Sequence, residues 1–217
     1  MKRYLASIYG TLLLGMVVSL QLPATGFPNQ KIDPVQADYK IGDVVADFQL
    51  RSVDGRSVSL RDFDNQKGVI VIFTCNHCPF SKAYEDRIGA LNGKFAGQGY
   101  PVIAINPSDP KSYEDDNFEK LKEHVSAKGH AYPYLVDDSQ TVARAFGANR
   151  TPQAYVLQNN GGKFTVRYIG TLDDNPQDPG SVRKHYVDDA VSNLLAGRPV
   201  TTTTTRAIGC AIKWKDA

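Results

Sequence analysis

Residues 68–74, followed directly by two cysteines, constrain the fold of this chain more than any other feature. They read Gly-Val-Ile-Val-Ile-Phe-Thr, an unbroken series of β-branched and aromatic residues. Because such a run has no polar side to turn toward water, it predicts a central strand that is covered on both faces. Beyond the cysteines, apolar residues recur with the spacing of one helix face: Tyr84, Ile88, Leu91 and Phe95. The cysteines are therefore expected between a buried strand and a helix.

The flanking segments continue this alternation of strands and helices. Residues 46–60 alternate apolar and polar around Asp54-Gly55, which predicts a hairpin with one buried face. After the first helix the patterns predict, in chain order, a strand at 101–105, a helix at 118–128, a strand at 134–136, a helix at 139–146, a hairpin at 153–168 and a helix at 182–194. This order predicts an α/β fold, a three-layer sandwich with a mixed central sheet.

The first residues have the layout of a secretory signal. Lys2 and Arg3 precede an uncharged apolar stretch at 4–22, and Pro23 and small residues follow it. We expect a signal peptide over 1–26 and export to the periplasm or another extracytoplasmic space. The alternative is an uncleaved anchor, because the apolar stretch has about the length of a short bilayer span of ~17–20 residues. Contact with a membrane is expected only in that case.

The remainder, about 190 of 217 residues, suits one domain. We place this domain at 41–199 and a tail at 200–217, which is expected to pack on the domain through Ile208, Ile212 and Trp214. Without Lys2 and Arg3 the 25 basic residues fall to 23 and balance the 23 acidic ones. A balanced chain gives no reason to expect a nucleic acid as partner.

The chain has only three cysteines, Cys75, Cys78 and Cys210. They are too few for a disulfide-stapled scaffold, so reactive thiols are expected. The pair Cys75-x-x-Cys78 is interpreted as a redox dithiol, as part of a zinc or copper site, or as inert. A structural zinc site needs four ligands, and no second such pair accompanies this one. The strand before it and the helix after it favour the redox dithiol, with no metal or other cofactor.

The head of a helix stabilises a thiolate, because its first N–H groups are unpaired and carry partial positive charge. Cys75 is therefore expected to be the exposed nucleophile with a lowered pKa, and Cys78 to be more buried and to resolve mixed disulfides. His77 either stabilises the Cys75 thiolate or is an exposed loop histidine. Pro79 leaves two alternatives: a kinked first turn, or a helix that begins at Pro79 with Cys78 as its cap. The second alternative would make Cys78 better placed for activation.

Two motifs carry a resemblance to a known family. Val-Ile-Phe-Thr-Cys-Asn-His-Cys-Pro-Phe at 71–80 and the later Arg150-Thr151-Pro152 resemble the thioredoxin superfamily, and within it the exported AhpC/TSA or redoxin-domain proteins. Residues 207–214, Ala-Ile-Gly-Cys-Ala-Ile-Lys-Trp, are similar to the tail of one peroxiredoxin-like subfamily. The resemblance implies a thioredoxin-like sandwich with an N-terminal hairpin and an inserted helical segment at 106–129. It also implies a cis Thr151–Pro152 bond that faces the cysteines and leaves the Thr151 backbone free to pair with a substrate.

The function expected from these residues is thiol–disulfide exchange with exported proteins, whose dithiols or disulfides are the substrates, together with a separate redox partner. A peroxiredoxin-like peroxidase is the alternative. Peroxide-reducing relatives place Thr three residues before the attacking cysteine, whereas Ile72 stands there relative to Cys75, so that pattern is absent. A Cu(I) carrier that uses the two thiols with His77 or His130 is a third possibility.

Three further features have open interpretations. Cys210 is a third redox thiol, a buried inert thiol or the site of an intermolecular disulfide. Arg150 either supplies positive charge to a thiolate or forms a surface ion pair. The acidic segments Glu114-Asp115-Asp116 and Asp173-Asp174 are interpreted as solvated surface, because their spacing does not fit a calcium loop.

Overall fold

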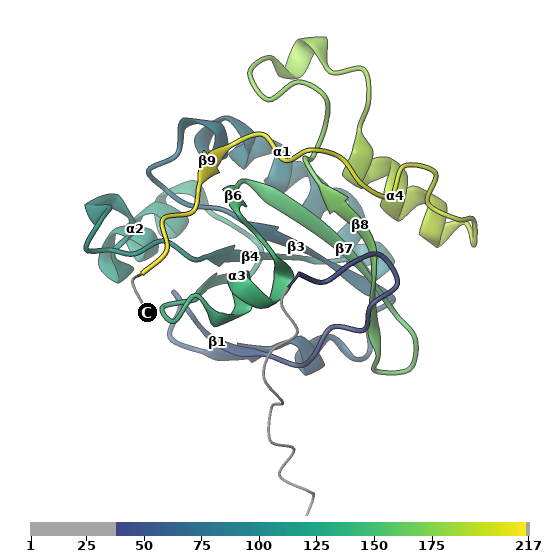
Figure 1. Ribbon diagram of the computed structural model, residues 1–217, viewed down its shortest axis with the longest axis horizontal. Helices are drawn as coiled ribbons and strands as arrows, with labels where there is room; N and C mark the ends of the chain where they lie inside the picture. The colour runs from purple at the N-terminus through teal and green to yellow at the C-terminus, as the bar shows by residue number, and fades with distance from the viewer. Residues whose placement is uncertain (1–37, 216–217) are drawn as a thin grey trace, which may run out of the picture. The chain divides into compact units, whose positions relative to one another are not determined.

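Seven strands form one mixed sheet in this protein (Figure 1). The structure, a computed structural model, describes residues 38–215, so the expected signal peptide lies outside the described residues. The sheet has the order β2-β1-β5-β4-β3-β7-β8. Its strands are β1 (Gln49–Ser52), β2 (Ser57–Ser59), β3 (Gly68–Phe73), β4 (Val102–Asn106), β5 (Tyr134–Val136), β7 (Gln153–Asn159) and β8 (Phe164–Gly170).

The register shows why the sheet is mixed. The strands β3, β4 and β5 are parallel neighbours, because a helix returns the chain between them. Tight connections make β1–β2 and β7–β8 antiparallel hairpins, with Leu50 opposite Val58 and Tyr155 opposite Ile169. A second, two-stranded sheet joins β6 (Arg150–Thr151) to β9 (Cys210–Ala211).

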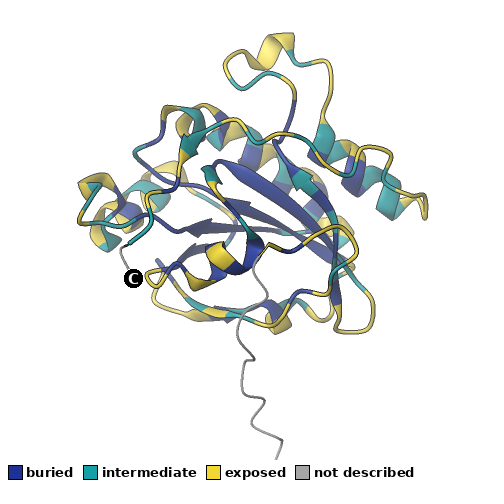
Figure 2. Ribbon diagram, in the orientation of Figure 1, coloured by how far each residue is buried: buried dark blue, intermediate teal, exposed yellow. Residues whose placement is uncertain are grey.

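Helices cover both faces of the large sheet. The helices are α1 (Pro79–Phe95), α2 (Phe118–Lys128), α3 (Thr141–Phe146) and α4 (Tyr186–Leu195). Ile70 and Ile72 of β3 belong to a buried cluster with α1, α2 and α4, whereas Val71 and Phe73 belong to a second cluster with α3. All residues of β3 are buried, as the dark central strands of Figure 2 show. This two-sided burial explains the unbroken apolar run in the sequence.

The predicted three-layer α/β sandwich is confirmed, including the N-terminal hairpin and the inserted helical segment. That segment contains a short 3₁₀ turn at Glu114–Asp116 and α2, and it lies between β4 and β5. Helix α2 begins at Asn117, whose side chain accepts from the N–H of Lys120, and ends at Gly129 with φ of 63°. The last helix begins later than its pattern predicts. Val182 follows another 3₁₀ turn, Pro179–Ser181, and α4 starts only at Tyr186.

The tail runs back across the domain. Thr204 forms a β-bridge with Ile169, and β9 then pairs with β6. Beyond β9, Ile212 donates its N–H to the carbonyl of Asn149, and Trp214 packs under the guanidinium of Arg144. Among the described residues, no helix combines the length and the apolar character that crossing a bilayer requires.

Candidate active site

The cysteine pair lies at the carboxyl end of β3, where the chain enters α1. Helix α1 begins at Pro79 and Cys78 is its N-cap, with extended backbone angles of −78° and 123°. Proline suits the first helical position because its missing N–H would have no helical partner there. Of the two alternatives that Pro79 left open, the structure therefore shows the second. Cys75 consequently lies one turn before the helix and not at its head.

This placement changes which sulfur is activated. The Cys75 thiol donates a hydrogen bond to Cys78, and the Cys210 thiol, the Cys210 N–H and the Ser81 N–H also face the Cys78 sulfur. These donors lower the pKa of Cys78 to about 4, against the opposing effect of its burial. The carbonyl oxygen of Thr151, 3.1 Å from Cys78 Sγ, also opposes ionisation, but it is one acceptor against several donors.

The pKa of Cys75 is raised, so the expectation of a lowered pKa at Cys75 is wrong. The largest cause is the hydrogen bond that its thiol donates to Cys78, and burial adds to it. The hydroxyl of Thr151, 3.0 Å from Cys75 Sγ, acts in the opposite direction. Cys75 is also not exposed as predicted. It is 3% exposed and Cys78 is 0% exposed.

The segment Thr151–Pro152 packs directly against the two sulfurs. Its peptide bond is cis, as the family resemblance implies, and both residues are buried. The hydroxyl of Thr151 contacts Cys75, and its carbonyl contacts Cys78. Thr151 thus touches both members of the pair and holds them at one edge of β6.

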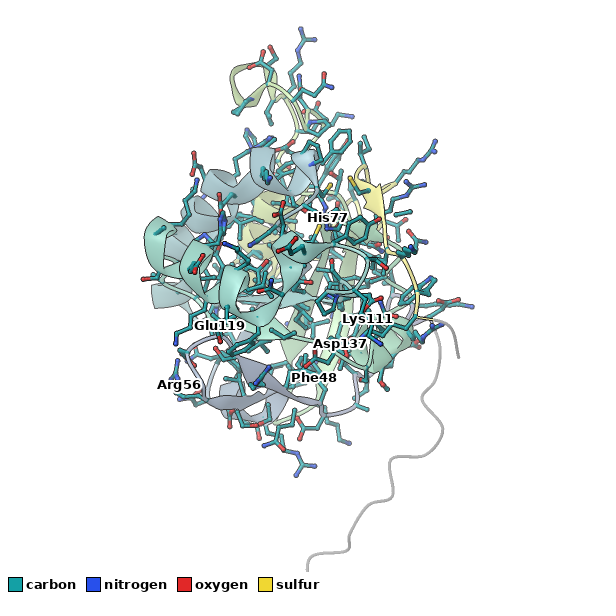
Figure 3. The ribbon with its side chains drawn as sticks, turned by 90° about the vertical axis from the view of Figure 1, so that its left-hand side faces the viewer. Phe48, Arg56, His77, Lys111, Glu119 and Asp137 are labelled. Carbon is teal, nitrogen blue, oxygen red and sulfur yellow. The ribbon has the colours of Figure 1, made fainter. Side chains whose placement is uncertain are left out.

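His77 is a half-buried residue and not an exposed loop histidine. Its side chain is 17% exposed, and its ring stacks on Tyr113 with a centroid distance of 3.6 Å. Nδ1 is hydrogen-bonded to the carboxylate of Asp116, and Nε2 lies 3.9 Å from Cys75 Sγ. Figure 3 shows His77 in the same upper part of the view as the tail strand. Cysteine, histidine and aspartate are therefore arranged in a row.

Asp116 is the site residue that the sequence analysis missed. It was interpreted as solvated surface, but it is 2% exposed. Besides His77, its carboxylate accepts from the N–H of Asn76 at 2.6 Å and from the side chain of Asn106 at 2.9 Å. Its neighbours Glu114 and Asp115 are exposed. The sequence alone does not indicate which of three consecutive acidic residues is buried. Asp116 is buried because the inserted segment folds back over β4.

Asp173 is a second correction of the same kind. It is 4% exposed, pairs with Arg87 at 2.7 Å and accepts from the Tyr84 hydroxyl at 2.8 Å. Its neighbour Asp174 is exposed, as predicted. Asp173 therefore fixes the loop after β8 to α1 and takes no part in the sulfur site.

The tail covers the site. Strand β9 pairs antiparallel with β6, and Cys210 is opposite Thr151. Gly209 fits so closely that a Cβ there would lie 2.2 Å from the carbonyl oxygen of Thr151. Arg150 has no ion pair with any residue of 38–215; its guanidinium donates to the carbonyl of Gly209 at 3.0 Å. Burial, with the hydrogen bond to Cys78, raises the pKa of Cys210 to about 12.

Two groups of side chains in the described residues have the donors and spacing of metal ligands. One is Cys75, His77 and Asp116; the other is Glu85, His124 and His130. Cys75 and the second group line the same small cavity of about 20 Å³ beside α1. Neither group contains Cys78, so the sequence-level alternative of a copper site on both thiols finds no such cluster among these residues.

Comparisons with known proteins agree with this geometry. The sequence model of the AhpC/TSA family matches residues 41–169. A hypothetical protein of Sinorhizobium meliloti 1021 of known crystal structure is 33% identical, with a TM-score of 0.76 over 83% of this chain and 97% of that one. The thiol-disulfide oxidoreductase ResA of Geobacillus thermodenitrificans (strain NG80-2) is 28% identical over 135 residues, 61% of this chain and 71% of ResA. The chloroplastic peroxiredoxin Q of Gentiana triflora is 29% identical over 145 residues, 59% of this chain and 57% of that protein.

Proposed function

This chain belongs to the AhpC/TSA family, and from that premise we propose that it is a thiol–disulfide oxidoreductase that uses the Cys75/Cys78 dithiol on exported proteins. The observation that carries the proposal is the contact of both sulfurs with Thr151 of the cis Thr151–Pro152 segment, at 3.0 Å from its hydroxyl to Cys75 Sγ and 3.1 Å from its carbonyl to Cys78 Sγ. Paired thiols with one lowered pKa can form and break a disulfide reversibly. The proposed export rests on the signal-like pattern of residues 1–26.

The reaction follows from the positions of the sulfurs. The Cys78 thiolate attacks one sulfur of a substrate disulfide, the substrate S–S bond breaks, and the leaving sulfur takes up a proton. Cys75 then loses its proton and attacks Cys78 Sγ, which releases the second substrate thiol and leaves a Cys75–Cys78 disulfide. The substrate gains two electrons and the dithiol loses two. In the opposite direction the same steps oxidise a substrate dithiol.

His77 is suited to the second step, because Cys75 must lose a proton against a raised pKa. Asp116 accepts the Nδ1 hydrogen and thereby directs Nε2 at Cys75 Sγ. The stacked ring of Tyr113 and the buried carboxylate fix the orientation of the imidazole. We assign to His77 the role of base for Cys75 and to Asp116 the role of a positioning residue.

Cys210 is placed to act as a third redox thiol. Its side chain interacts with that of Cys78, and its backbone pairs with Thr151, which contacts both sulfurs of the pair. Once a Cys75–Cys78 disulfide has formed, a deprotonated Cys210 can attack Cys78 Sγ, form a Cys78–Cys210 disulfide and release Cys75 as a thiol. The raised pKa of Cys210 makes this step slow at neutral pH.

The tail occupies the edge of β6, which the resemblance assigns to the substrate chain. An extended substrate would need the Thr151 backbone, and β9 already pairs with it. A protein substrate must therefore displace β9 before it can reach Cys78. We propose that the tail limits access of protein substrates to the dithiol.

Trapping of mixed disulfides tests the proposed function. All variants are made in a Cys210→Ser background, because Cys210 could otherwise attack Cys78 Sγ and release the trapped partner. Cys75→Ser removes the resolving thiol, so this variant should accumulate mixed disulfides through Cys78 when it meets a disulfide-bonded protein. Cys78→Ser should accumulate far fewer, and Cys75→Ser/Cys78→Ser should accumulate none. If only Cys78→Ser traps partners, Cys75 is the attacking sulfur. If neither variant traps any, the proposal is wrong.

Peroxide reduction is the second candidate, and the burial of the sulfurs favours it. With the tail in place a small oxidant can reach them more easily than a folded protein, and peroxiredoxin Q is among the similar proteins. The Cys78 thiolate would attack one peroxide oxygen, the O–O bond would break, and the other oxygen would leave as water or an alcohol after taking up a proton. Cys78 would then be a sulfenic acid, and the Cys75 thiol would displace its hydroxyl as water and form the disulfide. Peroxide consumption that depends on Cys78 and on added dithiol would support this function.

A further inference from the structure

Glu85, His124 and His130 direct three ligand atoms to one point beside α1. Glu85 lies on α1, His124 on α2, and His130 directly after the end of α2. Their ligand atoms all lie within 4.8 Å of one another. His124 Nε2 contacts Oε1 of Glu85, and His130 Nε2 lies 3.0 Å from the same oxygen. The reaction proposed for the dithiol uses none of these three side chains.

His130 has unsatisfied ring nitrogens, which an ordinary cluster of ion pairs does not explain. Its side chain is 7% exposed, and neither ring nitrogen has a hydrogen bond of proper geometry, although Nε2 is close to Glu85. Its ring is held in place by stacking on Tyr132, at a centroid distance of 4.8 Å. A buried polar group without a partner destabilises the fold, so a ligand for this nitrogen is expected.

The carboxylate of Glu85 is shared between Lys128 and the two histidines. Lys128 is 2.9 Å from Oε2 of Glu85 and thus leaves Oε1 on the side of the histidines.

The three side chains also border a cavity. The cavity of about 20 Å³ exceeds the ~10–15 Å³ that one water molecule needs. In a tetrahedral site with metal–ligand bonds of about 2.0–2.2 Å, the ligand atoms would lie roughly 3–3.5 Å from one another. The three ligand atoms here, all within 4.8 Å of one another, are close to this spacing. The cavity would hold the ion's remaining water ligand.

We propose that Glu85, His124 and His130 form a binding site for a divalent transition-metal ion, with Zn²⁺ as the best match. Two imidazole nitrogens and one carboxylate oxygen are common ligands of Zn²⁺, and soft Cu(I) would prefer thiolates. None of the three ligands belongs to the dithiol, although Cys75 lines the same cavity, and the proposal does not depend on the function proposed above.

A thiol-free protein, Cys75→Ser/Cys78→Ser/Cys210→Ser, tests the site without competing sulfur ligands. The same change removes the sulfur of the Cys75, His77 and Asp116 group. Zn²⁺ is titrated calorimetrically and by competition with a chromophoric chelator, and Co²⁺ is titrated by its visible absorption. His124→Gln, His130→Gln and Glu85→Gln are made in this background. His185→Gln is the matched control, because His185 is exposed and belongs to neither group.

We expect about one Zn²⁺ per chain, and affinity at least about tenfold weaker in each of the three variants, since even the loss of a group that merely supports a ligand costs about 10–100-fold. His185→Gln should bind as the parent does. Zn²⁺ should also raise the melting temperature of the parent and not that of His130→Gln. If the thiol-free protein misfolds, X-ray absorption spectroscopy of Zn²⁺-loaded wild type can show whether the ligands of the ion are nitrogen and oxygen atoms or sulfur atoms. No stoichiometric binding, unchanged affinity in His130→Gln, or a sulfur-ligated ion would overturn the proposal.

Discussion

Replacing Gly209 by alanine should lift the tail off the active site. A Cβ at this position would lie 2.2 Å from the carbonyl oxygen and 2.6 Å from the carbonyl carbon of Thr151. These are backbone atoms beside the buried sulfurs and cannot move aside as a flexible side chain would. The strand β9 must therefore separate from β6, while the hydrogen bond from Ile212 to Asn149 still holds the far end of the tail.

The size of the effect follows from the contacts that are lost. They are the β6–β9 pairing, the bond from Arg150 to the Gly209 carbonyl and the contact of the Cys210 N–H with the Cys78 sulfur. Three or so hydrogen bonds at about 1 kcal/mol each destabilise the closed tail by about 3 kcal/mol. Since about 1.4 kcal/mol corresponds to a factor of ten, the open fraction should rise about 100-fold, up to full opening.

The assay compares a large and a small substrate. Reduction of the disulfides of insulin, with dithiothreitol as regenerating reductant, should be up to about 100-fold faster in Gly209→Ala. Reduction of a small aromatic disulfide should change much less, because it needs less room. Gly93→Ala is the matched control, since a Cβ at Gly93 of α1 meets no atom within 4 Å. Equal insulin rates for Gly209→Ala and wild type would refute the idea that the tail limits access.

Three further predictions follow from the ionisable groups. The rate of alkylation of Cys78 should be nearly independent of pH between 6 and 8, because the pKa of Cys78 is lowered to about 4. The rate of alkylation of Cys210, whose pKa is raised to about 12, should increase about tenfold per pH unit. Parallel pH profiles for the two thiols would contradict both assignments. A thiol whose pKa falls on folding stabilises the folded state fully above its unfolded pKa of ~8.5, and this contribution is lost as the pH falls toward the folded pKa. In urea unfolding, the difference in unfolding free energy between reduced wild type and Cys78→Ser should therefore shrink as the pH falls toward 4. A difference that does not change with pH would contradict a thiolate at Cys78 in the folded state. Asp116→Asn should slow the resolution of mixed disulfides about 10–100-fold by releasing His77, while the exposed Asp115→Asn should not; equal rates in stopped-flow traces would remove Asp116 from the site.

The order of strands and helices could be predicted from the sequence because each element has a clear period. The strand β3 is apolar throughout since both of its faces are buried, and β8 alternates since only one of its faces is fully buried. The first five residues of β7, its hairpin partner, are buried on both faces. The start of α4 was predicted too early because Val182 continues the apolar spacing. The side chain of Asp178 caps a separate 3₁₀ turn there, and the helix begins after it.

The candidate site was only partly predictable. The pair Cys75 and Cys78 and the Thr151–Pro152 segment have local signatures. For the activated cysteine, Pro79 left two alternatives that the sequence could not separate, because a proline is compatible both with a kinked first turn and with Cys78 as the cap of α1. Asp116 and the Glu85 cluster were out of reach, since their partners come from segments about 40 residues away in the chain. Such contacts are set by how the insertion folds over β4 and α1, and no local pattern records them.

A redox titration of wild-type protein in glutathione buffers, with thiol trapping and peptide mapping, tests the dithiol most directly. The two sulfurs before α1 should pass together through a single reversible two-electron transition, and the first bridge to appear on oxidation should join Cys75 to Cys78. If these two thiols remain free while glutathione or Cys210 takes up all of the oxidation, the chain does not work as a dithiol and the function proposed for it is wrong.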